Sequence, residues 1–144
     1  MGEYSGNENR LLGIDYGEKR VGIAITDPLM MFASPLKTII RDNNFWNNIL
    51  DLFNQFNIEK VILGYPLKEN GEESSSTQLV KKFREQLEEK ITVPIELFDE
   101  RYSSEIAKQR IIESVPSKKK RRDKSLLDKN AAAIILQDYL DSIK

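Results

Sequence analysis

The chain has 144 residues, 40% of them hydrophobic, which suits one compact domain with its own core. It contains neither cysteine nor histidine, which excludes disulfides, thiolate and imidazole metal sites, and catalysis by histidine. The 22 basic and 23 acidic side chains give a net charge of −1, so the chain does not coat nucleic acid through bulk positive charge. Any chemistry must use carboxylates, lysines, hydroxyls or the backbone.

The first residues, MGEYSGNEN, are polar and lack the apolar segment of a secretion signal. No later stretch approaches the length of a membrane span. We therefore expect a polar tail over residues 1–9, a single domain over residues 10–144 and a cytoplasmic location.

The first part of the chain predicts three strands and a helix. Apolar and β-branched runs predict strands over residues 11–15, 21–26 and 36–40. The polar link YGEKR between the first two is typical of a β-hairpin. Apolar residues at helical spacing then predict an amphipathic helix over residues 45–56, with Trp46 on its buried face.

The rest of the chain alternates strands and helices. KVILG at 60–64 predicts a buried strand that ends at Tyr65-Pro66, and a polar loop with an Asn-Gly turn follows. The remaining pattern predicts a helix over 77–90, a strand over 93–98, a helix over 103–113, a charged connector and a last helix over 126–143.

This order predicts an α/β fold. Strands joined through helices should pair in parallel with right-handed crossovers. We therefore expect a mixed five-stranded sheet, an antiparallel meander of three strands plus two parallel strands, flanked by helices. Ligands of such sheets gather beyond the carboxyl ends of the parallel strands.

Three acidic positions are candidates for that edge. Asp15 closes the first strand, although it could instead cap the hairpin turn before Gly17. Asp99 and Glu100 close the strand VPIELF, and alternation lets only one of them face Asp15; both could equally cap the following helix. Asp128 shares a stripe of the last helix with small and apolar residues, although an acidic residue in a first turn also suits the helix dipole.

Carboxylates that meet at such an edge predict a metal site. Their mutual repulsion requires a cation, and oxygen ligands without histidine or cysteine suit Mg²⁺ or Mn²⁺. A phosphodiester is the natural substrate, because Mg²⁺ held by a few carboxylates completes its shell with water and phosphate oxygens.

A dense cationic run precedes the last helix. Its basic residues are Lys118, Lys119, Lys120, Arg121 and Arg122. The position just before Asp128 favours phosphate contact over a merely solvated connector. Lys19, Arg20 and Arg101 fall near the expected strand ends and could extend this nucleic-acid-binding surface. The chain lacks the GxxxxGK[ST] pattern of a P-loop.

Four blocks of the sequence match a known family in the family's order. They are LLGIDYGEKRVGIAI at 11–25, VILGYPL with a following glycine at 61–71, FDERYSS at 98–104 and DKNAAAIIL at 128–136. The chain thus resembles the bacterial Holliday-junction-resolvase-like proteins, also described as pre-16S rRNA nucleases.

The resemblance implies a ribonuclease-H-like fold, a divalent-metal nuclease site and a role in maturing the 5′ end of 16S rRNA. It also implies that Asp15, Glu100 and Asp128 are the catalytic carboxylates. Tyr65 and Tyr102 stand where the family often has leucine, which alters packing near the site without touching a carboxylate.

Two other functions stay open at this point. The same carboxylates could resolve four-way DNA junctions, and a stable dimer would favour that activity because it needs two symmetric cuts. Alternatively, the chain could be a non-catalytic RNA-binding ribosome assembly factor. We expect nucleic acid and ribosomal particles as partners, and a monomer or weak homodimer.

Overall fold

The computed structural model describes residues 8–100 and 124–143, with the backbone alone for residues 124–129. The predicted helix over 103–113, Arg101 and the cationic run at 118–122 lie outside the described residues. The described elements are β1 (Asn9–Asp15), β2 (Arg20–Thr26), β3 (Ala33–Ile40), α1 (Phe45–Gln55), β4 (Asn57–Tyr65), α2 (Ser75–Glu88), β5 (Ile95–Asp99) and α5 (Lys124–Ser142).

The five strands form one mixed sheet in the order β3-β2-β1-β4-β5. β1, β2 and β3 pair antiparallel, whereas β4 runs parallel to β1, and β5 parallel to β4. The register pairs Ile14 with Leu63 and Tyr65 with Asp99, so the carboxyl ends of β1, β4 and β5 reach the same edge. The predicted meander with two added parallel strands is confirmed.

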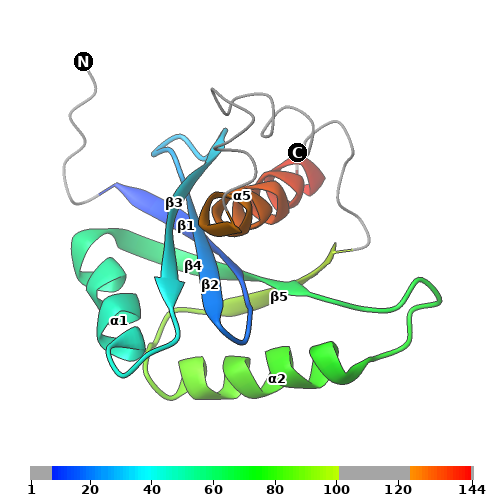
Figure 1. The fold of residues 1–144 in the computed structure, drawn as a ribbon. Helices are drawn as coiled ribbons and strands as arrows, with labels where there is room; N and C mark the ends of the chain where they lie inside the picture. Colours follow the sequence, from blue (N-terminus) through cyan, green and yellow to red (C-terminus); the bar gives the residue numbers. More distant parts are fainter. Residues whose placement is uncertain (1–7, 101–123, 144) are drawn as a thin grey trace.

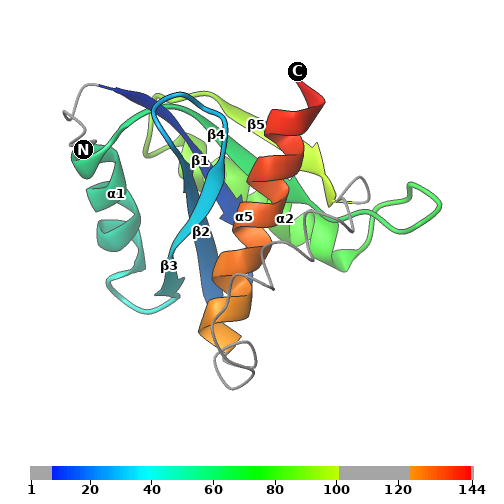
Figure 2. The ribbon, with the colours of Figure 1, turned by 90° about the horizontal axis from the view of Figure 1, so that it is seen from above.

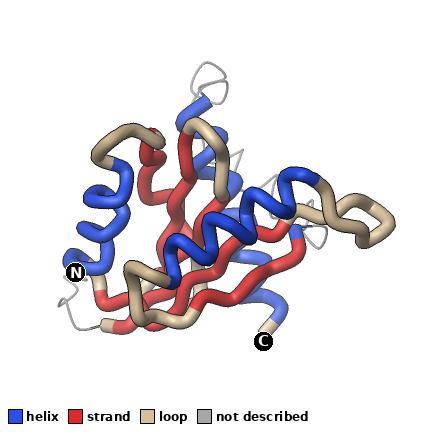
Figure 3. The backbone as a smooth tube through the Cα atoms, turned by 90° about the horizontal axis from the view of Figure 1, so that it is seen from below, coloured by secondary structure: helices blue, strands red, loops and turns tan. Residues whose placement is uncertain are grey.

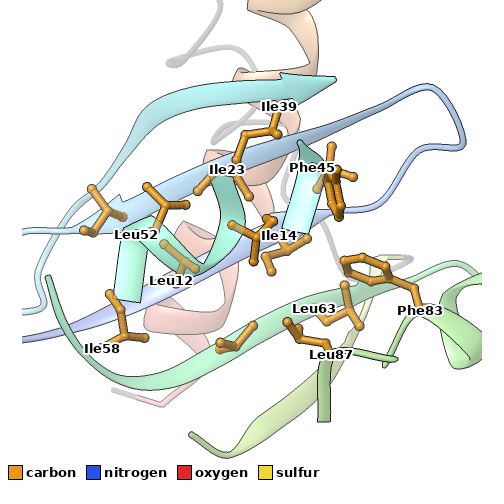
Figure 4. Close-up of a cluster of buried hydrophobic side chains, with 14 of the residues drawn as sticks. Leu12, Ile14, Ile23, Ile39, Phe45, Leu52, Ile58, Leu63, Phe83 and Leu87 are labelled. Carbon is orange, nitrogen blue, oxygen red and sulfur yellow. The ribbon is translucent and has the colours of Figure 1, made fainter. Parts of the chain in front are cut away.

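Helices cover both faces of the sheet. α1 and α2 lie on one face and α5 on the other (Figures 1, 2 and 3). The larger core lies under α1 and α2, where buried sheet residues such as Leu12, Ile14 and Leu63 meet Leu52 and Phe83 (Figure 4). A second core lies under α5 and includes Leu11, Ala24, Ile62, Ala132, Leu136 and Leu140.

α5 packs closely on β1 because Gly13 of β1 has no side chain and Ala132 of α5 has a small one. A Cβ atom added to Gly13 would lie 2.9 Å from the Leu136 Cβ and 3.1 Å from the Ala132 carbonyl oxygen. Any side chain at position 13 would therefore push the helix away from the sheet. The small side chain of Ala132 on α5 permits this close approach.

Several element boundaries differ from the prediction. β3 begins at Ala33 rather than at 36, since an edge strand tolerates Pro35. β5 begins at Ile95 rather than at 93, after Pro94, which has no N–H to give to the ladder. α2 begins at Ser75 rather than at 77, because Ser74 and Thr77 form a capping box.

The turn between β2 and β3 is closed by Asp27. Its carboxylate accepts hydrogen bonds from the backbone N–H groups of Phe32 at 2.8 Å, Met31 at 2.9 Å and Leu29 at 3.3 Å. Burial raises the pKa of Asp27, but these donors outweigh it and hold the pKa below its ordinary value of 3.8. The ionised carboxylate therefore stabilises the turn.

No helix in the described residues is long and apolar enough to cross a membrane.

Candidate active site

A cleft lies at the edge of the sheet where the parallel strands end. Its volume is about 230 Å³. Four lining residues follow or end β1, one follows β4, one follows β5 and three belong to α2: Asp15, Tyr16, Gly17, Glu18, Pro66, Glu100, Ser76, Leu79 and Val80. Two of the three predicted carboxylate residues, Asp15 and Glu100, thus share one cleft although 85 positions separate them in the sequence.

Strand alternation decides which face of the sheet each carboxylate occupies. On β1, Leu11 and Gly13 pack against α5, so Asp15, two residues further, falls on the α5 face. On β5, Phe98 packs edge-on against Tyr139 of α5, with 6.1 Å between ring centroids. Glu100 lies two residues after Phe98 and therefore falls on the same side, facing α5.

Asp99 falls on the opposite face of β5. Leu97 packs in the core under α1 and α2. Asp99 lies two residues further along the strand and therefore falls on the same face as Leu97. The structure therefore brings Glu100, rather than Asp99, to the face that carries Asp15.

Gly64 makes room for the Glu100 carboxylate. A Cβ atom added to Gly64 would collide with Glu100 Oε1 and lie 3.2 Å from Glu100 Cδ and 2.7 Å from Ile135 Cδ1. The Glu100 carboxylate thus packs directly on the backbone of Gly64 in β4, beside Ile135 of α5. Sequence reasoning did not single out Gly64, because its small size matters only through this contact.

Two contacts show that α5 runs antiparallel to β4. Tyr139 contacts Lys60 near the start of β4, with 3.2 Å from Oη to Nζ, whereas Ile135 lies over Gly64 near its end. The amino end of α5, which carries Asp128, therefore points toward the carboxyl ends of the parallel strands. The backbone of Asp128 lies one helical turn before that of Ala132 on α5.

The β1–β2 turn places two predicted basic residues beside the cleft. Gly17 is required in this turn, since a Cβ atom there would collide with the carbonyl oxygen of Arg20. Lys19 is exposed and Arg20 is partly buried at the start of β2. Both follow directly after Gly17 and Glu18, which line the cleft.

The α2 side of the cleft is held by polar contacts. The Thr77 hydroxyl donates a hydrogen bond to the carbonyl oxygen of Pro66 and thereby ties the end of β4 to α2. Glu73 accepts hydrogen bonds from Lys81 and, at 3.0 Å, from the Tyr65 hydroxyl. The Lys81 ammonium, followed by the Tyr65 hydroxyl, holds the pKa of Glu73 below its ordinary value.

The donor set of the cleft suits a hard divalent cation. Asp15, Glu18 and Glu100 line the cleft with carboxylates, and the chain has no histidine or cysteine that would select zinc or copper. Among residues 8–100 and 130–143, no cluster of three acidic residues forms by itself. A complete carboxylate set therefore needs a further residue, and Asp128 is the predicted one.

Comparison of the sequence with known proteins identifies relatives that cover most of the chain. The sequence model of a family described as "RuvX: Holliday junction resolvase" matches residues 9–142. A protein of Flavobacterium psychrophilum named "Putative pre-16S rRNA nuclease" is 43% identical over 132 residues, covering 91% of this chain and 96% of that protein. A Chlorobaculum tepidum protein of the same name is 42% identical over 141 residues, covering 96% and 97%.

Solved structures share the fold at low sequence identity. The fowlpox virus resolvase in complex with Holliday junction DNA aligns with a TM-score of 0.55 and 16% identity, covering 93% of this chain and 98% of that one. The RuvC structure of Thermus thermophilus aligns with a TM-score of 0.52 and 12% identity, covering 92% and 96%. The fold is therefore ribonuclease-H-like, as the sequence blocks predicted.

Proposed function

The chain belongs to the RuvX family, described as Holliday junction resolvases, and from this premise we propose that it is a divalent-metal-dependent nuclease that matures the 5′ end of 16S rRNA. The observation that carries the proposal is the shared cleft of Asp15 and Glu100 at the carboxyl edge of β1, β4 and β5. Such an edge is where open α/β sheets bind their ligands.

Asp15, Glu100 and Asp128 would hold the metal. Mg²⁺ or Mn²⁺ bound there would supply positive charge for the attacking and leaving oxygens of a phosphodiester. The chain would contribute the positions of the ligands. β1 ends at Asp15, and the absence of a side chain at Gly64 leaves room for Glu100. The close packing of α5 on β1 at Gly13 would bring Asp128 toward them.

Basic side chains would hold the RNA strand across this edge. Lys19 and Arg20 stand beside the cleft, and the predicted set also includes Arg101 and the run at 118–122. Phosphate contacts of this kind position the strand without reading its sequence. Substrate choice would then depend on RNA shape and on contacts to the 2′-hydroxyl groups.

RNA is the preferred substrate class for this proposal. Relatives at 42–43% identity carry the pre-16S rRNA nuclease name, whereas the resolvase structures share only 12–16% identity with the chain. The family description favours a second candidate, cleavage of four-way DNA junctions. A role on ribosomal precursors would place the protein in the cytoplasm, with ribosomal particles as partners.

A cleavage assay separates these functions. The substrates are precursor 16S rRNA, an unrelated single-stranded RNA and a four-way DNA junction, each with Mg²⁺, with Mn²⁺ and without metal. We expect metal-dependent cleavage of the precursor at its 5′ end and none of the junction. Junction cleavage by a dimer would favour the resolvase, and RNA binding without cleavage would favour an assembly factor.

Asp99→Asn is the matched control for Glu100→Gln. Both changes remove one carboxylate at the end of β5. Asp99, the last residue of the strand, falls on the α1 and α2 face, whereas Glu100, directly after it, lies against Gly64 and α5. Loss of cleavage in Glu100→Gln together with activity in Asp99→Asn would support the cleft as the active site.

A further inference from the structure

Arg41, directly after β3, is surrounded by three aromatic rings. Its guanidinium carbon lies 4.6 Å from the ring centroid of Phe45, 5.3 Å from that of Tyr16 and 5.6 Å from that of Phe83. The rings contact one another, with 4.7 Å between the centroids of Tyr16 and Phe83. Phe45 and Phe83 lie at one end of the larger core (Figure 4). The packing therefore holds the cation in one place.

The guanidinium has no anionic partner in the described part of the chain. Its Nη1 atom is buried and has no hydrogen-bond acceptor there. By contrast, Lys60, Lys81 and Arg84 each form an ion pair with a glutamate. Arg41 as a residue is only partly buried. A partly desolvated cation without a carboxylate partner binds an incoming anion more strongly than a fully solvated one, because aromatic surroundings screen charge poorly.

Arg41 stands next to the candidate active site. The Tyr16 ring that contacts Arg41 also lines the cleft, directly after Asp15. The backbone N–H of Arg41 donates a 2.9 Å hydrogen bond to the carbonyl oxygen of Lys19, in the turn that borders the cleft. The aromatic cluster lies on the α1 and α2 face of the sheet, whereas Asp15 and Glu100 fall on the α5 face.

We propose that Arg41 binds a phosphate of the RNA strand that flanks the cleaved bond, on the α1 and α2 side of the cleft. Tyr16 links the two places, because it lines the cleft of the carboxylates and its ring contacts this guanidinium, so a strand that crosses the sheet edge there would reach Arg41. The planar fork of arginine suits two phosphate oxygens at once. Arg41 is thus a positioning residue that holds the substrate and does not touch the reacting atoms. The inference rests on the proposed nuclease function and adds a binding subsite to it.

The test compares Arg41 with a cation elsewhere on the same aromatic cluster. Lys90 Nζ lies 5.0 Å from the ring centroid of Trp46, and Trp46 stacks on Phe83 at 5.6 Å. Lys90 lines a different surface hollow, beside α1. Arg41→Gln and Lys90→Gln each remove one positive charge from the cluster, but only the first does so beside the cleft.

The measurement is the affinity for a labelled single-stranded RNA across a salt series, without divalent metal. For Arg41→Gln we expect about tenfold weaker binding at low salt, the effect of one lost charged contact. The slope of log affinity against log salt should fall by roughly 0.7, the value for one phosphate contact on a single strand. Lys90→Gln should keep the wild-type slope. Arg41→Lys should restore the slope but not the full affinity.

Melting curves control for folding. If Arg41→Gln does not fold, Arg41→Met takes its place, because the methionine side chain still packs on the rings. Arg41→Met should show the same decrease in the slope of log affinity against log salt. Equal slopes for the wild type and the neutral Arg41 variants would overturn the inference. A wild type that binds RNA but never cleaves it would contradict the proposed function alone, since the salt comparison still decides the role of Arg41. A wild type that binds no RNA would overturn both.

Discussion

Replacing Gly64 with alanine tests whether the position of the Glu100 carboxylate matters. The new methyl group would overlap Glu100 Oε1 and lie 2.7 Å from Ile135 Cδ1. Overpacking of this kind costs about 1–3 kcal/mol. Alanine recovers about 0.5–1 kcal/mol, because glycine is unfavourable within a strand. The net loss of about 0–2.5 kcal/mol leaves a domain of ordinary stability folded, since the free energy of unfolding of such domains is about 5–15 kcal/mol.

Activity should fall much more than stability in Gly64→Ala. The carboxylate end of Glu100 is the flexible partner of the collision, so it should move away from β4. A displacement of about 1 Å in a catalytic group can cost about a hundredfold in rate. The assay is single-turnover cleavage of precursor 16S rRNA with excess enzyme, together with urea unfolding.

Ile62→Val is the matched control for Gly64→Ala. Ile62 lies two residues earlier on β4, is fully buried on the same face, and its shortening costs about 0.5–1.5 kcal/mol. We expect this variant to be less stable but fully active. Wild-type cleavage by Gly64→Ala would refute the assignment of Glu100 to the site.

Three further predictions concern separate parts of the molecule. Asp15→Asn and Glu100→Gln should each lower single-turnover cleavage at least a hundredfold, on the order of the effect of misplacing a catalytic group, whereas Asp99→Asn should stay near wild type. Replacing the five basic residues of 118–122 with glutamine should lower the slope of log RNA affinity against log salt by roughly 0.7 per lost phosphate contact. The cleavage rate at saturating substrate should stay within about tenfold of the wild-type rate. An unchanged slope would make that run a solvated connector. Asp27→Asn should be less stable than wild type at neutral pH in urea unfolding. Since the folded-state pKa of Asp27 lies below 3.8, its contribution exists above that pH and disappears as the pH falls further, so the two unfolding curves should converge in acid. A constant gap between them would contradict this.

The sheet was predictable because each connection has few physical solutions. A short polar link after Asp15 forces an antiparallel neighbour, and a helical segment between strands forces a parallel one. Those two rules bring Asp15 and Glu100 to one edge. Alternation along β5 then separates Glu100 from Asp99 once the side that faces α5 is known.

Contacts between distant segments were not predictable from the sequence. The role of Gly64 depends on a carboxylate 36 positions later, and nothing local marks that glycine as special. The setting of Arg41 likewise arises from three rings on three segments of the chain. In the printed sequence Arg41 is one basic residue in a polar stretch, whereas the dense run at 118–122 attracts attention through composition alone.

The most direct test of the metal-dependent cleft is a Mg²⁺ titration of single-turnover cleavage at the 5′ end of precursor 16S rRNA, by the wild type and by Asp128→Asn. The wild type should need the metal, and Asp128→Asn should be slower by at least about a hundredfold at every Mg²⁺ concentration, with a melting temperature no lower than that of the wild type without metal, because the variant loses charge repulsion. Cleavage by the wild type without metal, or undiminished cleavage by Asp128→Asn, would contradict the account.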